Sequence, residues 1–144
     1  MRTRSLIKLV AVGLFLFGCT STAEQMAEKG IEPMTAAELR EAFTGNSAYV
    51  KGPNWEYTGY YRTDGTLIGR SWWQGGEETA TATWEIKEEG LFCRDWDNDW
   101  GGGGYGCARM YRDGENIVYD NVSGSKGKYP TGTMTLSEGN AFNL

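Results

Sequence analysis

The segment 95–106 holds the densest group of side chains that could do chemistry. Its aspartates lie at alternate positions: Asp95, Asp97 and Asp99. Carboxylate oxygens at short range are the ligands that a hard cation such as Ca²⁺ prefers. A calcium loop of the usual kind also needs a glycine at its sixth position and a glutamate at its twelfth, where this chain has Trp100 and Gly106. Two alternatives remain for these carboxylates, a calcium site of another design or a solvated acidic loop.

Aromatic side chains in the same segment could bind a ligand or a partner: Trp96, Trp100 and Tyr105. A run of glycines at 101–104 separates the last two and favours a flexible connection. Two tryptophans on such a loop can bury a large area against another molecule, and binding residues are often carried on loops. The segment is therefore a candidate recognition loop.

A second candidate binding surface lies on a hairpin predicted over 55–73. If Asp64-Gly65 forms a two-residue turn, Arg70 lies opposite Gly59. In that register Arg70 shares a face with Trp55, Tyr57, Tyr61, Ile68 and Trp72. An arginine among rings can make cation–π contacts and can hold an anion in a small ligand pocket. A turn that is one residue longer places Arg70 on the opposite face, where it is an outward cation beside ordinary core aromatics.

The chain contains no histidine. Its absence removes the Ser-His-Asp and Cys-His nucleophile systems, the His-ligated zinc and haem sites, and the usual general base near neutral pH. Two carboxylates alone can hydrolyse a glycosidic bond, but the sequence singles out no pair of acidic residues. We therefore predict no catalytic residues, and no cofactor apart from the calcium alternative.

Alternation of apolar and polar residues predicts the strands that must position these side chains. Short antiparallel strands joined by turns, without crossover helices, favour an up-and-down meander that curls on itself to protect its edges. The predicted fold class is mainly β: a small antiparallel meander that closes into a partly open barrel. Its strands are expected at 55–63, 66–73, 80–87, 91–96, 106–112, 117–122 and 131–137.

One short helix is predicted before these strands. Thr35 and Glu38 have the spacing of a capping box, which marks the beginning of a helix over about 36–43. Its apolar stripe is too small for the helix to be stable alone, so the helix must dock on the sheet. Helix and strands together define one domain, residues 34–144.

The N-terminus, residues 1–18, has the layout of a secretory signal, in which positive charges precede a short apolar run. The run ends in Leu16-Phe17-Gly18-Cys19, which resembles the bacterial lipobox. The resemblance implies cleavage before Cys19 and a palmitate-bearing lipid on its thiol, with ordinary signal cleavage as the alternative. Thr20, rather than an aspartate, follows Cys19, which implies the outer membrane, facing the periplasm. Residues 19–33 are small, polar and weakly patterned, and are predicted to be a tether.

Removal of the signal changes the net charge. The signal contains three cations and no anions, so Lys+Arg falls from 14 to 11 against 19 Asp+Glu, and the mature chain carries a charge of −8. Such a surface repels nucleic acid and anionic headgroups. We therefore predict no nucleic-acid partner, and a membrane reached through the lipid anchor alone.

Two cysteines, Cys93 and Cys107, remain once Cys19 is assigned to the lipid. In an oxidising compartment, two cysteines of a small domain most simply form one disulfide. A thiol metal site lacks further soft ligands here, and a thiol nucleophile lacks a histidine. We predict a Cys93–Cys107 disulfide.

Several segments together resemble a family of small uncharacterised bacterial envelope proteins. The resemblance implies a secreted or lipid-anchored, β-rich domain of unknown function with a cysteine pair at Cys93 and Cys107, and it carries over no catalytic residues. The segments cover most of the mature chain: AELREAFTGNS at 37–47, YYRTDGT at 60–66, TWEIKEEGLFCRDW at 83–96, CARMYRDGE at 107–115 and EGN at 138–140.

The function expected from the sequence is that of a non-catalytic envelope lipoprotein. It would bind a partner protein, a small ligand or a cell-wall component through the aromatic and acidic loop face. One alternative is a carboxylate-dependent enzyme that acts on envelope glycans. Another is a purely structural envelope protein.

Overall fold

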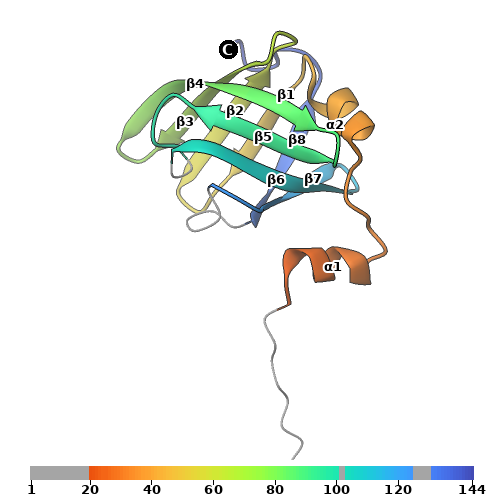
Figure 1. Ribbon diagram of the computed structural model, residues 1–144. Helices are drawn as coiled ribbons and strands as arrows, with labels where there is room; N and C mark the ends of the chain where they lie inside the picture. The colour runs from red at the N-terminus through yellow and green to blue at the C-terminus, as the bar shows by residue number, and fades with distance from the viewer. Residues whose placement is uncertain (1–19, 101–102, 125–130) are drawn as a thin grey trace, which may run out of the picture.

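The computed structural model describes residues 20–100, 103–124 and 131–144. It contains two short helices followed by eight antiparallel strands (Figure 1). No helix within these ranges is long and apolar enough to cross a bilayer. The elements in chain order are α1 (Thr22–Glu28), α2 (Ala36–Phe43), β1 (Ser47–Lys51), β2 (Trp55–Tyr61), β3 (Thr66–Trp73), β4 (Gly76–Lys87), β5 (Leu91–Trp96), β6 (Gly104–Asp113), β7 (Asn116–Asn121) and β8 (Thr131–Ser137).

The strands form a closed barrel in which each strand pairs with its neighbours in sequence and β8 returns to pair with β1. The predicted class, a mainly β up-and-down antiparallel barrel, is confirmed. The expectation of a partly open barrel is wrong, because the sequence analysis missed β1. Val50 of β1 lies opposite both Tyr57 of β2 and Met134 of β8, so this short strand closes the gap. Eight strands enclose an interior just wide enough for side chains or for one small ligand.

The hairpin of β2 and β3 has a different register from the one predicted with a two-residue turn. The last hydrogen-bonded pair of the two strands is Arg62 and Thr66, and three residues, 63–65, lie between them. Arg70 therefore lies opposite Thr58 rather than Gly59. Since side chains alternate along a strand, one additional loop residue moves every side chain of β3 to the other face. Arg70 and Trp72 consequently lie on the outside of the barrel.

Helix α2 spans the residues predicted for the short helix and covers one end of the barrel (Figure 1). Thr35 Oγ1 accepts a hydrogen bond from the Glu38 backbone N–H, and the Glu38 carboxylate accepts one from the Thr35 backbone N–H, which completes the capping box. Phe43 is fully buried, and its ring centroid lies 5.0 Å from those of Tyr61 and Phe92. The helix thus plugs this end with a close-packed core.

Helix α1 lies within residues 19–33, which were predicted to be a weakly patterned tether. Ser21 and Glu24 form a second capping box, a signal that the sequence contains and the analysis overlooked. Met26 is only 4% exposed, and Lys29 Nζ lies 2.6 Å from Asp113 Oδ2 at the end of β6. These contacts hold α1 beside the barrel. The predicted signal and Cys19 lie outside the described residues.

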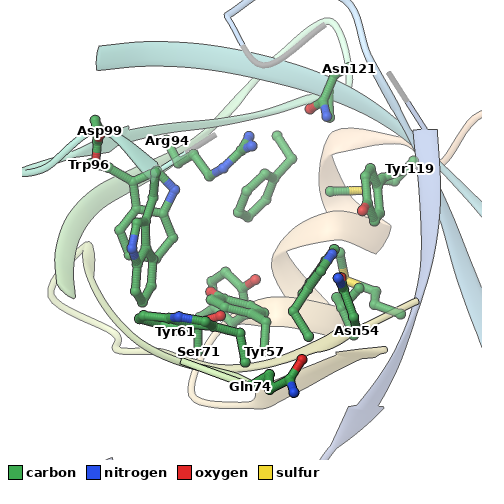
Figure 2. Close-up of a pocket in the computed structure, with 18 residues that line it drawn as sticks. Asn54, Tyr57, Tyr61, Ser71, Gln74, Arg94, Trp96, Asp99, Tyr119 and Asn121 are labelled. Atoms are coloured by element: carbon green, nitrogen blue, oxygen red, sulfur yellow. The ribbon is translucent and has the colours of Figure 1, made fainter. Parts of the chain in front are cut away.

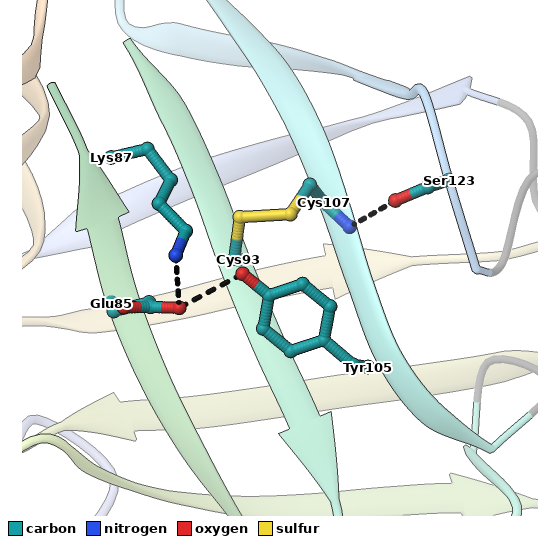
Figure 3. The surroundings of a disulfide bond; sticks show 6 residues. All are labelled: Glu85, Lys87, Cys93, Tyr105, Cys107 and Ser123. Carbon is teal, nitrogen blue, oxygen red and sulfur yellow. Dashed lines mark hydrogen bonds and ion pairs between the residues drawn. A yellow bond between two sulfur atoms is a disulfide. The ribbon is translucent and has the colours of Figure 1, made fainter. Parts of the chain in front are cut away.

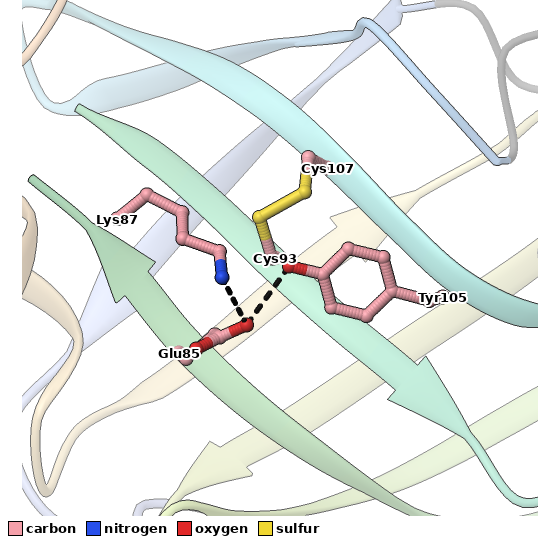
Figure 4. A network of polar contacts seen from close by, with 5 residues as sticks. All are labelled: Glu85, Lys87, Cys93, Tyr105 and Cys107. Carbon is pink, nitrogen blue, oxygen red and sulfur yellow. Dashed lines mark hydrogen bonds and ion pairs between the residues drawn. A yellow bond between two sulfur atoms is a disulfide. The ribbon is translucent and has the colours of Figure 1, made fainter. Parts of the chain in front are cut away.

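The predicted disulfide joins Cys93 of β5 to Cys107 of β6, which lie directly opposite each other (Figure 3). Both side chains are on the outer face of the barrel wall. Beside them the Tyr105 hydroxyl donates a hydrogen bond to Glu85 at 2.8 Å, and the hydrogen bond from Lys87 lowers the pKa of the Glu85 carboxyl (Figure 4). The disulfide therefore clamps two neighbouring strands without entering the barrel interior.

Candidate functional site

The barrel contains a cavity of about 520 Å³ at the end opposite α2 (Figure 2). The β1–β2, β3–β4 and β5–β6 connections surround its mouth, whereas α2 is bound at the other end through an ion pair between Arg40 and Glu88 of the β4–β5 turn. This volume lies within the range usual for small-molecule sites. The lining residues are Val50, Asn54, Trp55, Tyr57, Tyr61, Ser71, Trp73, Gln74, Phe92, Arg94, Trp96, Asp99, Trp100, Ala108, Met110, Tyr119, Asn121 and Met134.

One wall of the cavity is a cluster of three aromatic side chains, Tyr57, Trp96 and Trp100, called here the aromatic wall. The ring centroids of Trp96 and Trp100 lie 4.9 Å apart, and that of Tyr57 lies 6.1 Å from Trp96 and 6.2 Å from Trp100. Gly69 of β3 makes room for these rings, because a Cβ there would lie 2.6 Å from the nearest atom of Trp96. The packed rings form a rigid apolar surface.

The end of β5 and the loop that follows it bring two tryptophans, Trp96 and Trp100, into the cavity. The Trp100 indole N–H donates to Glu78 Oε2 at 2.8 Å, and the Trp100 backbone N–H donates to Asn98 Oδ1 at 3.1 Å. Trp96 is 8% exposed and lines the interior (Figure 2). The structure therefore brings together the predicted residues Trp96 and Trp100. It places the third, Tyr105, on the outer face of β6, where it is 49% exposed.

The cavity also contains a small set of polar side chains. Arg94 lies on the inward-facing side of β5, and Figure 2 shows its guanidinium group extending into the interior, toward the side on which Asn121 and Tyr119 lie. Among the lining residues in the described ranges, Arg94 is the one cation and Asp99 the one carboxylate. The cavity is thus mainly apolar, with a single interior arginine.

Tyr57 and Tyr61 both line the cavity in the barrel interior. Burial raises the pKa of Tyr57 well above its usual value and raises the pKa of Tyr61 to about 12. The positive charge of Arg94 opposes part of both pKa increases. Both hydroxyls are therefore protonated at neutral pH and are available as hydrogen-bond donors.

The aspartates of the calcium alternative point in different directions. Asp95 lies on the outer face opposite Tyr105, Asp97 accepts a hydrogen bond from the Thr81 backbone N–H at 3.2 Å, and Asp99 lines the cavity. Within the described ranges, no group of three or more His, Cys, Asp or Glu side chains could hold a metal ion. The geometry does not assemble Asp95, Asp97 and Asp99 into one cation site.

The predicted pair Arg70 and Trp72 makes contacts on the outer surface. The guanidinium carbon of Arg70 lies 5.7 Å from the centre of the Trp72 ring, and Arg70 Nε lies 3.8 Å from Glu77 Oε1. The cation–π contact expected from the sequence is therefore present. It is on the opposite side of the barrel wall from the cavity, because of the changed register of the hairpin.

No protein-family model matches the chain, and no curated protein matches it. The resemblance to bacterial envelope proteins therefore stays a prediction. The geometry of the cavity is what supports a functional proposal.

Two cavity residues, Arg94 and Asn121, were not singled out by the sequence analysis. A signal for Arg94 was present, because it alternates with Phe92 and Trp96 in the strand predicted over 91–96 and must share their inward face. A cation on an apolar face is costly unless it is paired or used. Asn121 gave no comparable signal, because it lies at the end of its strand.

Proposed function

We propose that the protein is a non-catalytic binding module of the bacterial cell envelope that holds one small, mostly apolar ligand inside its barrel. The observation that carries this proposal is the cavity of about 520 Å³, which is lined mainly by aromatic and aliphatic side chains. Protein interiors are normally close-packed, with few voids larger than a water molecule. A hollow of this size beside a well-packed core favours a ligand over a purely structural role.

A small ligand suits this geometry better than a partner protein or a cell-wall polymer. Trp96 and Trp100 line the cavity, and the indole N–H of Trp100 donates a hydrogen bond to Glu78 of the barrel itself. Among the described residues, the exposed large hydrophobic side chains are Trp73 at 44% and Tyr105 at 49%. Two separate rings do not make the contiguous apolar patch that marks a macromolecular interface.

The cavity also favours binding over glycan hydrolysis. A hydrolase of the two-carboxylate type needs two acidic groups that face the same bond. Asp99 is the only Asp or Glu among the cavity-lining residues of the described chain. The carboxylate-dependent enzyme therefore gains no support from this arrangement.

A neutral fluorescent probe tests the proposed ligand site. N-phenylnaphthylamine is apolar and fluoresces in dry surroundings, and we expect saturable binding of one molecule per chain with energy transfer from Trp96 and Trp100. Ser71→Phe adds a ring at an inward position of β3 and should weaken binding about tenfold or more, because it occupies the cavity. Ile68→Phe adds the same ring to the outer face of the same strand and should leave binding unchanged.

The two β3 variants are compared only if both unfold cooperatively in urea. Equal probe affinity of Ser71→Phe and Ile68→Phe would contradict a ligand site inside the barrel. Absence of saturable binding to the wild-type protein would contradict the proposed function itself.

The envelope location is tested separately through Cys19. Radiolabelled palmitate should enter the wild-type protein in bacterial cells and should not enter Cys19→Ala, because a thioether-linked lipid needs that thiol. Fractionation should place the labelled protein in the outer membrane. Incorporation of palmitate into both proteins would contradict the lipid anchor at Cys19. It would not bear on the ligand site, which the fluorescent probe tests independently.

A further inference from the structure

Arg94 occupies a position that a small barrel normally gives to an apolar side chain. It lies between Phe92 and Trp96 on the inward face of β5. Charged side chains are rarely inside a protein, because leaving water is costly. Figure 2 shows that the guanidinium group extends into the cavity rather than back toward the surface. The cavity is therefore built around a positive charge.

The positive charge of Arg94 is opposite in sign to the net charge of the whole chain. The whole chain carries a net charge of −5, and Arg94 is the one cation among the lining residues of the described chain. Its influence reaches its neighbours, because it lowers the pKa values of Tyr57 and Tyr61 against the effect of burial. Apolar walls strengthen such a field, since the local dielectric constant is low. Asp99, the one lining carboxylate of the described chain, is exposed in the loop after β5, so Arg94 is the charged group that faces the interior. The interior thus favours an anion that the outer surface repels.

Neutral hydrogen-bonding groups surround the same space. Asn121 is 2% exposed and lines the cavity together with Tyr119 (Figure 2). The hydroxyls of Tyr57 and Tyr61 stay protonated at neutral pH because burial raises their pKa values. Amide and hydroxyl groups can donate to an acceptor, and a guanidinium group presents N–H donors in a fork that matches an acidic group. These groups are suited to a charged oxygen acceptor.

The aromatic wall is suited to the remainder of such a ligand. Trp96 and Trp100 pack at 4.9 Å, and Tyr57 completes the wall in contact with both. A planar apolar body can pack against these rings with little loss of conformational freedom. We propose that the ligand is a planar, largely apolar organic anion whose single acidic group, a carboxylate or a sulfonate, is held by Arg94. This specification rests on the proposed ligand site and names the class of molecule that the site selects.

Two matched probes separate this inference from the proposed function. Anilinonaphthalene sulfonate and N-phenylnaphthylamine share their ring system and differ by the sulfonate. Wild-type protein should bind the sulfonate about tenfold more tightly than the neutral probe. Arg94→Gln should weaken sulfonate binding about tenfold or more and change neutral-probe binding less than about twofold, because only the charge contact is removed. Arg94→Lys should retain part of the preference.

Arg109→Gln is the matched control, because it removes one cation from the outer face of β6 and changes the net charge equally. It should leave both affinities unchanged. Two results would overturn the anion assignment and leave the proposed ligand site intact. One is an equal loss of affinity for both probes in Arg94→Gln, and the other is an equal affinity of the wild-type protein for both probes. If Arg94→Gln does not fold, the wild-type comparison decides: a sulfonate preference that weakens with salt supports the inference, and its absence contradicts it. Binding of neither probe overturns the proposed function.

Discussion

The two ends of the barrel contain the same kinds of side chain but pack them differently. At the end covered by α2, Phe43, Tyr61 and Phe92 have ring centroids 5.0 to 5.5 Å apart and are at most 3% exposed. At the other end, aromatic residues surround a cavity of about 520 Å³, and Trp73 at its mouth is 44% exposed. One short helix makes the difference, because it fills one end only.

The comparison shows that aromatic content alone does not mark a binding site. Phe43 of α2 is core, Tyr61 and Phe92 belong to both the core and the cavity lining, and the rings of Trp96 and Trp100 are available to a ligand. Close packing contributes stability, and a hollow gives up part of that contribution. Substitutions at the capped end should therefore act mainly on stability, and those at the open end mainly on binding.

The largest effect on stability is expected from Phe43→Ala at the capped end. This substitution removes a fully buried ring and should lower the free energy of unfolding by about 3–5 kcal/mol. Trp100→Ala at the open end should cost about 1 kcal/mol, because that side chain is only partly buried. Urea unfolding of both variants measures the difference, and equal losses would remove the distinction between the two ends.

Removal of the disulfide should cause the next largest loss of stability. Cys93 and Cys107 are separated by 14 positions, and a bridge of that span contributes about 3 kcal/mol in the chain-entropy model. The double variant Cys93→Ala with Cys107→Ala should lose about that much stability and keep its affinity for N-phenylnaphthylamine, because the bridge lies on the outer wall. Wild-type protein with its disulfide reduced is the control, and it should lose about as much stability as the double variant. A parallel loss of probe affinity would show that the cavity depends on this clamp.

Alkaline pH should weaken the region where the two ends meet. Tyr61 packs on Phe43 and also lines the cavity, and burial raises its pKa to about 12. The unfolded-state pKa is about 10, so the folded state favours the protonated hydroxyl. The resulting stability is present below about pH 10 and is lost as the pH rises through about 12, by about 3 kcal/mol.

Tyrosinate absorbance and circular dichroism measure this alkaline transition together. In the wild-type protein the last tyrosines should ionise only as the barrel unfolds. Tyr61→Phe should shift the alkaline unfolding midpoint upward, because it removes one of the two interior hydroxyls whose pKa burial raises, whereas Tyr105→Phe on the outer face should shift it much less. Ionisation of every tyrosine in a folded barrel would show that the interior admits water.

The smallest effect should follow Thr35→Ala at the capping box of α2. The lost cap should cost about 1 kcal/mol of stability and leave probe affinity unchanged. Ser21→Ala removes the equivalent cap of α1, which lies outside the barrel, and should cost less in global unfolding. A larger loss from Ser21→Ala would indicate that α1 contributes to the domain more than α2.

Most of the fold could be predicted from local patterns. The capping box at Thr35 marked α2, and alternation from Ala80 to Ile86 marked the inward face of β4. β1 was missed because its five residues carry little alternation, and its place is fixed by two partner strands rather than by its own sequence. Closure of the barrel depends on tertiary pairing between strands and therefore cannot be predicted from the sequence of any single segment.

The site was harder to predict than the fold. The sequence pointed to Trp96 and Trp100, but their direction depends on Gly69 and on the acceptor Glu78, both distant along the chain. Arg70 was placed near the rings by assuming a two-residue turn, and a single additional loop residue moved it outside. A register error of one residue moves every side chain of a strand to the opposite face. Which residues face the inside of the barrel can therefore be assigned only from the structure.

Helix α1 is attached to the barrel away from the mouth of the cavity. Lys29 meets Asp113 where β6 ends, which is the end that α2 covers. If Cys19 carries the proposed lipid, an anchor attached through α1 leaves the mouth at the other end of the barrel free for a ligand to enter.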